Sequence, residues 1–300
     1  MSGRDLGASV RQRLLNHSRM QGRPFQELLQ YFAMERFLYR LTKSRFADRF
    51  VLKGALLLTV WQAPLSRSMM DIDLAGRTTN DLDHIHAVVG EVCGAAVEQD
   101  GIVFNPASIE VSRINEDAEY EGVRVRFHAT LAKARIPMQI DIGFGDVIVP
   151  RPVEVEYPAL LEFPPPVLIA YPKETVIAEK LEAMTTRGLL NSRLKDYYDI
   201  ALLGRLYPFD GAILVEAIRS TFGHRETAIE KVPVGLTDAF SLEPARIVQW
   251  KAFVRRNRFD SQSSLDELVA QVRSFASAPL SAATRKGAFR SHWEPGGPWS

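Results

Sequence analysis

The sequence predicts an α/β (α+β) fold in which a mixed α/β domain is followed by a helical domain. Residues 123–131, "VRVRFHATL", alternate polar and apolar side chains as a half-buried strand does. Residues 136–149, "IPMQIDIGFGDVIV", indicate a second strand, and apolar residues recur at helical spacing after Pro172. These observations place strands in the first part of the chain and helices in the second.

The first part of the chain also contains helical patterns. In order, the expected elements are helices over 6–22 and 24–43, a buried helix after Gly54, a short strand within 69–77, a helix over about 81–97, and β-structure over 108–149. Gly22 and Pro24 separate the first two helices, and Asn80 is the candidate N-cap of the helix over about 81–97.

A proline cluster predicts the domain boundary. Seven prolines lie between 150 and 172, which favours a linker there. We expect a domain over 1–170 with the N-terminal helices, a helical domain over 171–280, and a flexible tail over 281–300 that is rich in Gly, Pro and Ser. The helices expected in the second domain lie near 173–187, 192–206, 210–222, 243–257 and 264–277.

The composition argues against a disulfide-bonded or membrane-spanning protein. The net charge of the 300 residues is +1, and a single cysteine, Cys93, cannot form an internal disulfide. A reducing, cytoplasmic compartment fits this cysteine use. We find no apolar run that could span a membrane and no signal peptide. Basic residues are in excess over 1–50 and within 246–258, where they are Arg246, Lys251, Arg255, Arg256 and Arg258.

Asp71 and Asp73 are the first candidates for a functional site. Side chains two apart on a strand point to the same face, so both carboxylates project together. Two such carboxylates suit a hard divalent cation, most simply Mg²⁺, and Asp141 could supply a third. Asp146 is a weaker candidate. The alternative is that one aspartate pairs with an arginine such as Arg67 while the other reaches solvent.

Lys180 lies on the apolar side of a predicted helix. Val176, Ile177 and Met184 stand three or four residues from it, so its side chain starts from the buried stripe. Such a lysine either extends to the surface or points into a site that needs a cation.

Asp196 and Asp199, in "RLKDYYDI", share one face of the next predicted helix. Acids on helices are usually surface or cap groups. These two could instead act as a base, or hold Arg193 or Lys180 in place.

The pair Lys53–Gly54 precedes the predicted buried helix. A glycine at a helix start lets backbone N–H groups approach a phosphate, with help from the helix dipole. Together with carboxylates on strands and an inward lysine, this turn suits nucleotidyl transfer, which depends on metal ions and cations around phosphates.

Five stretches in a fixed order, "LKGALLL", "SRSMMDIDL", "QIDIGF", "ETVIAEKLEAM" and "RLKDYYDI", resemble the AbiEii/AbiGii toxin family, which includes MenT-like toxins. They span roughly residues 50–203. The family belongs to the DNA polymerase β-type nucleotidyltransferase superfamily. The resemblance implies a nucleotidyltransferase-type mixed sheet flanked by helices, followed by a C-terminal helical bundle.

The resemblance also implies an activity. It implies transfer of a nucleoside monophosphate from an NTP with Mg²⁺, to the 3′ end of tRNA in some relatives, and a cognate antitoxin protein as partner. Asp71 and Asp73 would then be catalytic metal ligands with Asp141, Lys180 a catalytic contact to the nucleotide phosphate, and Asp196 the catalytic acid. The candidate nucleotide-binding residues are Lys53, Gly54, Arg67, Lys180 and Asp199.

One motif departs from the family pattern. The family usually has Lys-Gly-Gly followed by Ser or Thr, whereas this chain has Lys53-Gly54-Ala55-Leu56. Leu56 cannot hydrogen-bond to a phosphate. A catalytically weak NTP- or RNA-binding regulatory protein is therefore the alternative function, and a metal-dependent phosphohydrolase or nuclease is a third.

Overall fold

The computed structural model describes residues 3–63, 69–114, 122–257 and 263–300. These residues form two compact units. Unit 1 holds the described residues up to Asp146 together with Val153–Ala170, and unit 2 holds Val147–Pro152 and Tyr171–Ser300.

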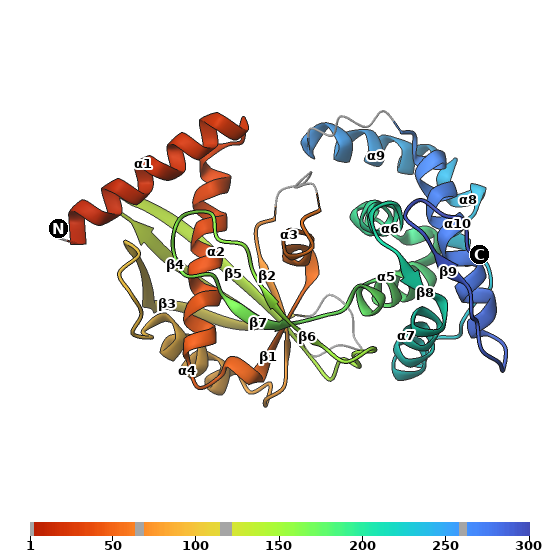
Figure 1. Cartoon of the computed structure of the whole chain (residues 1–300), viewed down its shortest axis with the longest axis horizontal. Helices are drawn as coiled ribbons and strands as arrows, with labels where there is room; N and C mark the ends of the chain where they lie inside the picture. The colour runs from red at the N-terminus through yellow and green to blue at the C-terminus, as the bar shows by residue number, and fades with distance from the viewer. Residues whose placement is uncertain (1–2, 64–68, 115–121, 258–262) are drawn as a thin grey trace. The chain divides into compact units, whose positions relative to one another are not determined.

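Unit 1 begins with the two predicted helices, α1 (Gly3–Gln21) and α2 (Phe25–Lys43). The chain turns between them at Gly22, whose φ of +64° lies in the left-handed region. α2 is buried along most of its length and packs on the sheet (Figure 1). Its aromatic and aliphatic side chains, including Phe32 and Phe37, supply much of the core of unit 1.

The described strands of unit 1 form a mixed sheet of seven strands in the order β3-β4-β5-β2-β1-β7-β6. β2 pairs with β5 and β1 pairs with β7 in parallel, while the other pairs are antiparallel. The mixed α/β fold that the sequence predicts is confirmed. The strands are β1 (Phe50–Lys53), β2 (Ile72–Gly76), β3 (Ile102–Ile114), β4 (Gly122–Leu131), β5 (Ala134–Phe144), β6 (Val153–Glu156) and β7 (Val167–Ala170).

Short elements connect these strands. Ala47–Arg49 (η1) and Gly54–Leu56 (η2) are 3₁₀ turns, and α3 (Leu57–Val60) is the buried helix expected after Gly54. The helix α4 (Leu82–Cys93) is capped by Asp81, which accepts the His84 N–H at 2.8 Å, and not by Asn80 as the sequence suggested.

The proline-rich segment is not merely a linker, which corrects the expectation for 150–172. Its ends, 150–152 and 171–172, belong to unit 2, whereas Val153–Ala170 belongs to unit 1. β6 and β7 pair with each other, and β7 pairs with β1, so the segment completes the sheet of unit 1. The prolines lie outside the two strands, where they remove no ladder hydrogen bond.

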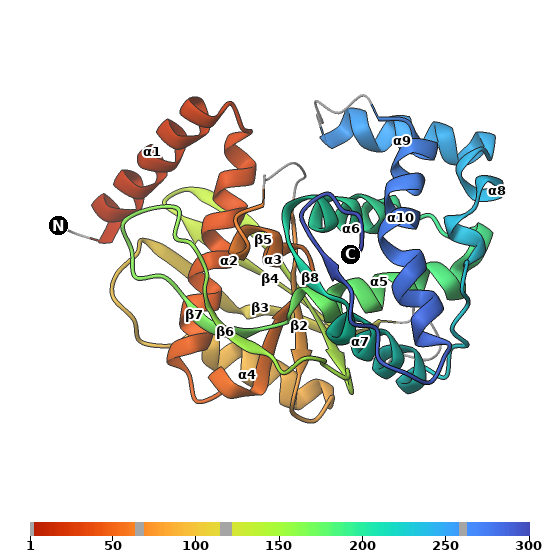
Figure 2. The same cartoon turned by 45° about the vertical axis from the view of Figure 1, so that its right-hand side comes forward.

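Unit 2 is a helical bundle. α10 packs against α6 and α7, and α5 packs against α7 (Figure 2). The helices are α5 (Lys173–Arg187), α6 (Leu194–Leu206), α7 (Gly211–His224), α8 (Asp238–Ser241), α9 (Pro244–Asn257) and α10 (Leu265–Ala283), with 3₁₀ turns at Gly188–Leu190 (η3) and Val234–Leu236 (η4).

The end of the chain is packed, although the sequence predicted a flexible tail. β9 (His292–Trp293) pairs with β8 (Phe209–Asp210). The indole N–H of Trp293 donates to the Gly204 carbonyl at 2.6 Å, and that of Trp299 donates to the Phe275 carbonyl at 2.7 Å. Burial of these aromatic rings holds the C-terminal segment in place despite its many glycine and proline residues.

None of the described helices is long and apolar enough to cross a membrane.

A buried ion cluster fixes α2 within unit 1. Arg40 forms two hydrogen bonds to Asp100 at 2.7 and 3.0 Å, and Arg36 lies 3.2 Å from Glu35 and 3.3 Å from Asp100. The Leu160 N–H donates to the second oxygen of Glu35 at 2.7 Å. Burial raises the pKa of Glu35 to about 7, and the Leu160 N–H and Arg36 offset this only in part.

The raised pKa of Glu35 predicts how stability depends on pH. The pKa is higher in the folded chain than its ordinary value of 4.5, so the folded state binds the extra proton. The free energy of unfolding should therefore fall by on the order of 3 kcal/mol as the pH rises from below 4.5 to above 7.

The variant Glu35→Gln keeps an oxygen for the Leu160 N–H and does not titrate. Thermal melts of both proteins from pH 5 to pH 8 should show the wild type losing stability relative to the variant. A constant difference in melting temperature across this range would show that Glu35 does not titrate there.

Candidate functional site

Three carboxylates converge in unit 1. Asp71 lies just before β2, Asp73 lies in β2, and Asp141 lies beside Asp73 in the parallel strand β5. One oxygen from each lies within 4.8 Å of the others, and all three residues are half-buried. A set of oxygen ligands at this separation fits a hard divalent cation such as Mg²⁺. The structure thus brings together the three residues expected to bind metal, and their binding of metal stays a prediction.

Gly54 makes room for one of these carboxylates. Its φ is +73°, and a Cβ added to it would lie 1.9 Å from Oδ2 of Asp73. The antiparallel pairing of Lys53 with Asp73 brings the turn to this position. A side chain at position 54 would displace Asp73, so the glycine is required by the carboxylate as well as by the backbone. Its contact with nucleotide phosphate stays a prediction.

Leu56 faces the interior. Its side chain is fully buried, in the turn where the family pattern has a hydroxyl. Its burial gives a structural reason for leucine at this position, because the side chain contributes to the core.

Arg124 binds Asp141, and the sequence analysis did not select it. Its Nε and one Nη donate to the two oxygens of Asp141 at 2.8 and 2.7 Å, from the facing position of β4. The alternation in "VRVRFHATL" does place Arg124 on the same face as Arg126 and His128, which was the available signal. The arginine named as a possible partner, Arg67, lies outside the described residues.

Lys53 binds Asp146. Its Nζ donates to Oδ2 of Asp146 at 2.6 Å, and the Asp146 side chain is 1% exposed. Asp146, the weaker metal candidate, is therefore an anchor for Lys53 and is not in the group of three carboxylates. Gly143 leaves space here, since a Cβ on it would lie 3.3 Å from both groups.

The other predicted residues form a cluster within unit 2. Lys180 Nζ donates to Asp196 at 2.5 Å and to Asp199 at 2.9 Å, and Arg193 lies 3.0 Å from the second oxygen of Asp196. Both aspartates are buried. Lys180 thus does not extend alone to solvent, and the aspartates hold both Lys180 and Arg193.

Asp196 is a carboxylate at neutral pH. Burial would raise its pKa, but the nearby charges of Lys180 and Arg193 outweigh burial and lower the pKa below its ordinary value. Asp196 is therefore suited to accept hydrogen bonds and not to donate a proton.

The Gly54 contact predicts the effect of a single methyl group. Gly54→Ala should lower the free energy of unfolding more than Gly22→Ala does. Both substitutions place alanine in the left-handed region, which costs ~1–2 kcal/mol, but only the alanine at position 54 would clash with Asp73. Gly22 has open space around it and is the matched control.

Urea unfolding measures both variants, and a Mn²⁺ titration followed by electron paramagnetic resonance measures cation binding. Gly54→Ala should also lose Mn²⁺ affinity. Equal destabilisation by the two substitutions would contradict the role given to Gly54.

The Lys180 cluster predicts a large cost for removing its cation. Lys180→Met leaves Asp199 and one oxygen of Asp196 buried without their ammonium partner, which should cost roughly 3–5 kcal/mol of unfolding free energy. The deficit should shrink as the pH falls toward 4, because protonation removes the unpaired charge.

Lys195→Met is the control. Lys195 is exposed on α6, the helix that carries Asp196 and Asp199, and its substitution should change stability little. Denaturant unfolding of both variants at pH 4 and pH 7 tests this. Equal stability of Lys180→Met and the wild type at pH 7 would rule the charge cluster out as a stabilising element.

Two crystal structures from Helicobacter pylori are similar to this chain. JHP933 is 16% identical with a TM-score of 0.49, covering 86% of this chain and 91% of its own. A protein provisionally described as a nucleotidyltransferase is 16% identical with a TM-score of 0.48, covering 88% of this chain and 99% of its own. No curated protein matches the chain.

The family model described as "Nucleotidyl transferase AbiEii toxin, Type IV TA system" matches residues 36–271, well over half of the chain. The match includes β1, β2 and β5 of unit 1 and α5 and α6 of unit 2, which carry the candidate residues. The chain therefore belongs to the AbiEii nucleotidyltransferase toxin family of type IV toxin–antitoxin systems.

Proposed function

We propose that this chain transfers a nucleoside monophosphate from an NTP to an RNA acceptor, the 3′ end of tRNA, with Mg²⁺. The observation that carries the proposal is the group of three carboxylates beside the Lys53–Gly54 turn. The family supplies the nucleotidyltransferase activity and implies an antitoxin partner. The proposed place of action is the cytoplasm, where NTPs and tRNA are present.

In this proposal Asp71, Asp73 and Asp141 hold the cation. A divalent cation bound there would neutralise phosphate oxygens and stabilise charge on the attacking and leaving oxygens. Arg124 already binds Asp141 on the side away from Asp73, and so fixes the direction of that carboxylate.

Lys53 and Lys180 are the proposed phosphate contacts. Asp146 orients Lys53, and Asp196 and Asp199 orient Lys180. Because both of the latter aspartates are buried, we assign them as positioning residues that act through Lys180. Arg67, a predicted nucleotide contact, lies outside the described residues.

Helix α9 supports RNA as the acceptor. Trp250 is its buried residue, and Lys251, Arg255 and Arg256 are exposed along it. Exposed cations on one helix suit contact with an RNA backbone. The excess of basic residues over 1–50 offers fewer contacts to RNA than its composition suggests, because Arg36 and Arg40 are buried in the ion cluster of α2.

A catalytically weak NTP- or RNA-binding protein is the second candidate function. Buried Leu56 favours it, because the turn after Gly54 offers no side-chain hydroxyl at that position.

A labelling experiment tests the proposed function. Purified protein is incubated with total tRNA, Mg²⁺ and each α-³²P-labelled NTP in turn. Label should enter RNA with one NTP, and Asp71→Ala should reduce it by about two orders of magnitude or more. Asp83→Ala, an exposed acid in α4, is the matched control and should keep full activity.

Undiminished labelling by Asp71→Ala would refute the assignment of the site. Clear binding of an NTP without any transfer would support the second candidate function. Shortened RNA in place of labelled RNA would indicate a nuclease that uses the same carboxylates.

A further inference from the structure

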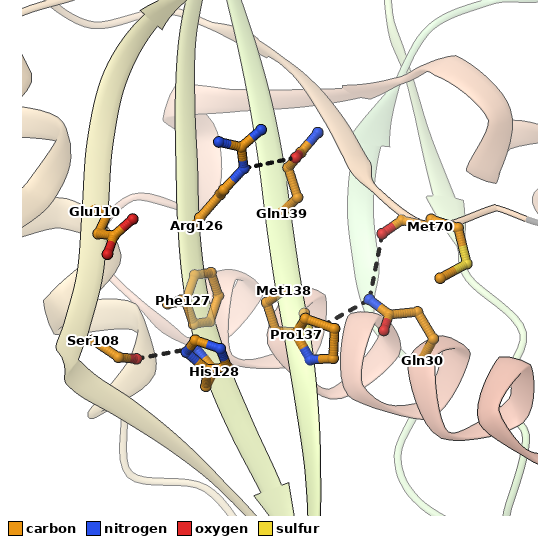
Figure 3. A pocket seen from close by; sticks show the side chains of 10 residues that line it. All are labelled: Gln30, Met70, Ser108, Glu110, Arg126, Phe127, His128, Pro137, Met138 and Gln139. Atoms are coloured by element: carbon orange, nitrogen blue, oxygen red, sulfur yellow. Dashed lines mark hydrogen bonds between the residues drawn. The ribbon is translucent and has the colours of Figure 1, made fainter.

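A pocket of about 320 Å³ opens on the face of the unit 1 sheet that carries the carboxylates. Figure 3 shows Arg126 and Gln139 extending side by side from β4 and β5, and Gln30 reaching the edge of β5 from α2. The volume of the pocket lies near the lower end of the range for small-ligand pockets, about 300–1,000 Å³. This volume therefore suits a single nucleotide.

Two irregularities of the sheet create this pocket. β2 pairs with β5 only from Ile72 and Ile140 onward, so the earlier residues of β5 lie beyond the end of β2. Gln30 reaches this edge and donates to the Met70 carbonyl at 3.3 Å. On the other side, the register of β3 shifts between Asn105 and Glu110.

The pocket shares a wall with the carboxylates. Gln139 precedes Asp141 by two residues on the same face of β5, and its amide donates to Asp141 Oδ2 at 3.4 Å. Met70, also in the wall, directly precedes Asp71. A ligand in the pocket would lie next to any cation that the carboxylates hold.

The wall offers a cation and unused hydrogen-bonding atoms. Arg126 lines the pocket, is exposed, and donates from its Nε to Gln139 at 3.1 Å. Among the described residues, Oε1 of Gln30 and Nδ1 of His128 are buried without a hydrogen-bond partner. Burying such atoms without a partner is unfavourable, and a polar ligand could bond to them after a small local movement.

The carboxylates separate this pocket from the Lys53–Gly54 turn. Lys53 pairs with Asp73 from β1, and its Nζ lies near Gly143, two residues after Asp141 on β5. The pocket residue Gln139 lies two residues before Asp141 on the same strand. In-line phosphoryl transfer needs the attacking and leaving oxygens on opposite sides of the phosphorus. With the pyrophosphate on the Lys53–Gly54 side, the acceptor belongs on the pocket side.

We infer that this pocket binds the terminal nucleotide of a single-stranded RNA acceptor, an inference that rests on the proposed function. Pro137 and Met70 offer apolar contact to a base, and Arg126 pairs with a phosphate of the strand. The terminal ribose hydroxyl oxygen bonds to the α-phosphorus of the NTP as the bond to pyrophosphate breaks. The hydroxyl proton passes to solvent, and pyrophosphate leaves with the bonding electron pair.

Binding measured without catalysis tests the pocket. The probe is a 5′-fluorescein-labelled RNA tetranucleotide, ACCA, followed by fluorescence anisotropy, with a second probe that lacks the terminal base. Arg126→Gln should raise the Kd for ACCA about tenfold, as expected for one charged hydrogen-bonded contact. Arg135→Gln, an exposed arginine on the same face of β5 outside the pocket, should leave it unchanged.

The Kd of each variant for NTP, measured by calorimetry, separates the two substrates. Arg126→Gln should leave this value unchanged, and removal of the terminal base should weaken binding of the RNA to the wild type. Weaker NTP binding by Arg126→Gln would assign the pocket to the donor nucleoside instead. Equal effects of the two arginine substitutions, or no binding of ACCA by the wild type, would overturn the inference.

The outcome is distinguishable from failure of the proposed function. If the wild type labels tRNA and Arg126→Gln keeps its KM for tRNA, the pocket assignment is wrong and the function stands. If no RNA is labelled but ACCA binding depends on Arg126 and the terminal base, the pocket stands and the proposed transfer is wrong.

Discussion

Repulsion among three carboxylates is the constraint on which the site in unit 1 depends. Oxygens within 4.8 Å of one another repel by about 3 kcal/mol per charged pair at an effective dielectric constant near 20. The backbone ladders of β1, β2 and β5 hold Asp73 and Asp141 together against this force, and Gly54 admits the Asp73 side chain. Arg124 offsets one of the negative charges. The sheet thus holds ready a negative site whose repulsion a cation would relieve.

In unit 2 the buried acidic groups lie beside cations and not beside other acidic groups of a metal site. Two buried aspartates would be costly alone, and Lys180 and Arg193 make their burial tolerable. The same contacts fix the ammonium of Lys180, a flexible side chain that would otherwise sample many rotamers. Lys53 is fixed in the same way by Asp146 in unit 1. In both units a buried carboxylate therefore converts a mobile lysine into a positioned charge.

Much of this arrangement could be predicted from the sequence, and the failures have physical causes. The periodicity of α5 and the two-residue spacing of Asp71 and Asp73 are local patterns, and both led to the right neighbours. Arg124 was missed because its partner is brought to it by strand register, which no local pattern encodes. The 150–172 segment was misread because prolines flank its strands, and the tail was misread because Trp293 packs against distant residues of unit 2.

The position of β7 has a consequence for how the chain is made. β1 lies between β2 and β7, yet β7 is synthesised after all the other strands of the sheet. Until Val167–Ala170 leaves the ribosome, the outer edge of β1 lacks its partner strand and can pair with other chains. The Lys53–Gly54 turn directly follows β1, so the surroundings of this turn are completed late. A partly translated chain can therefore aggregate through the unpaired edge of β1.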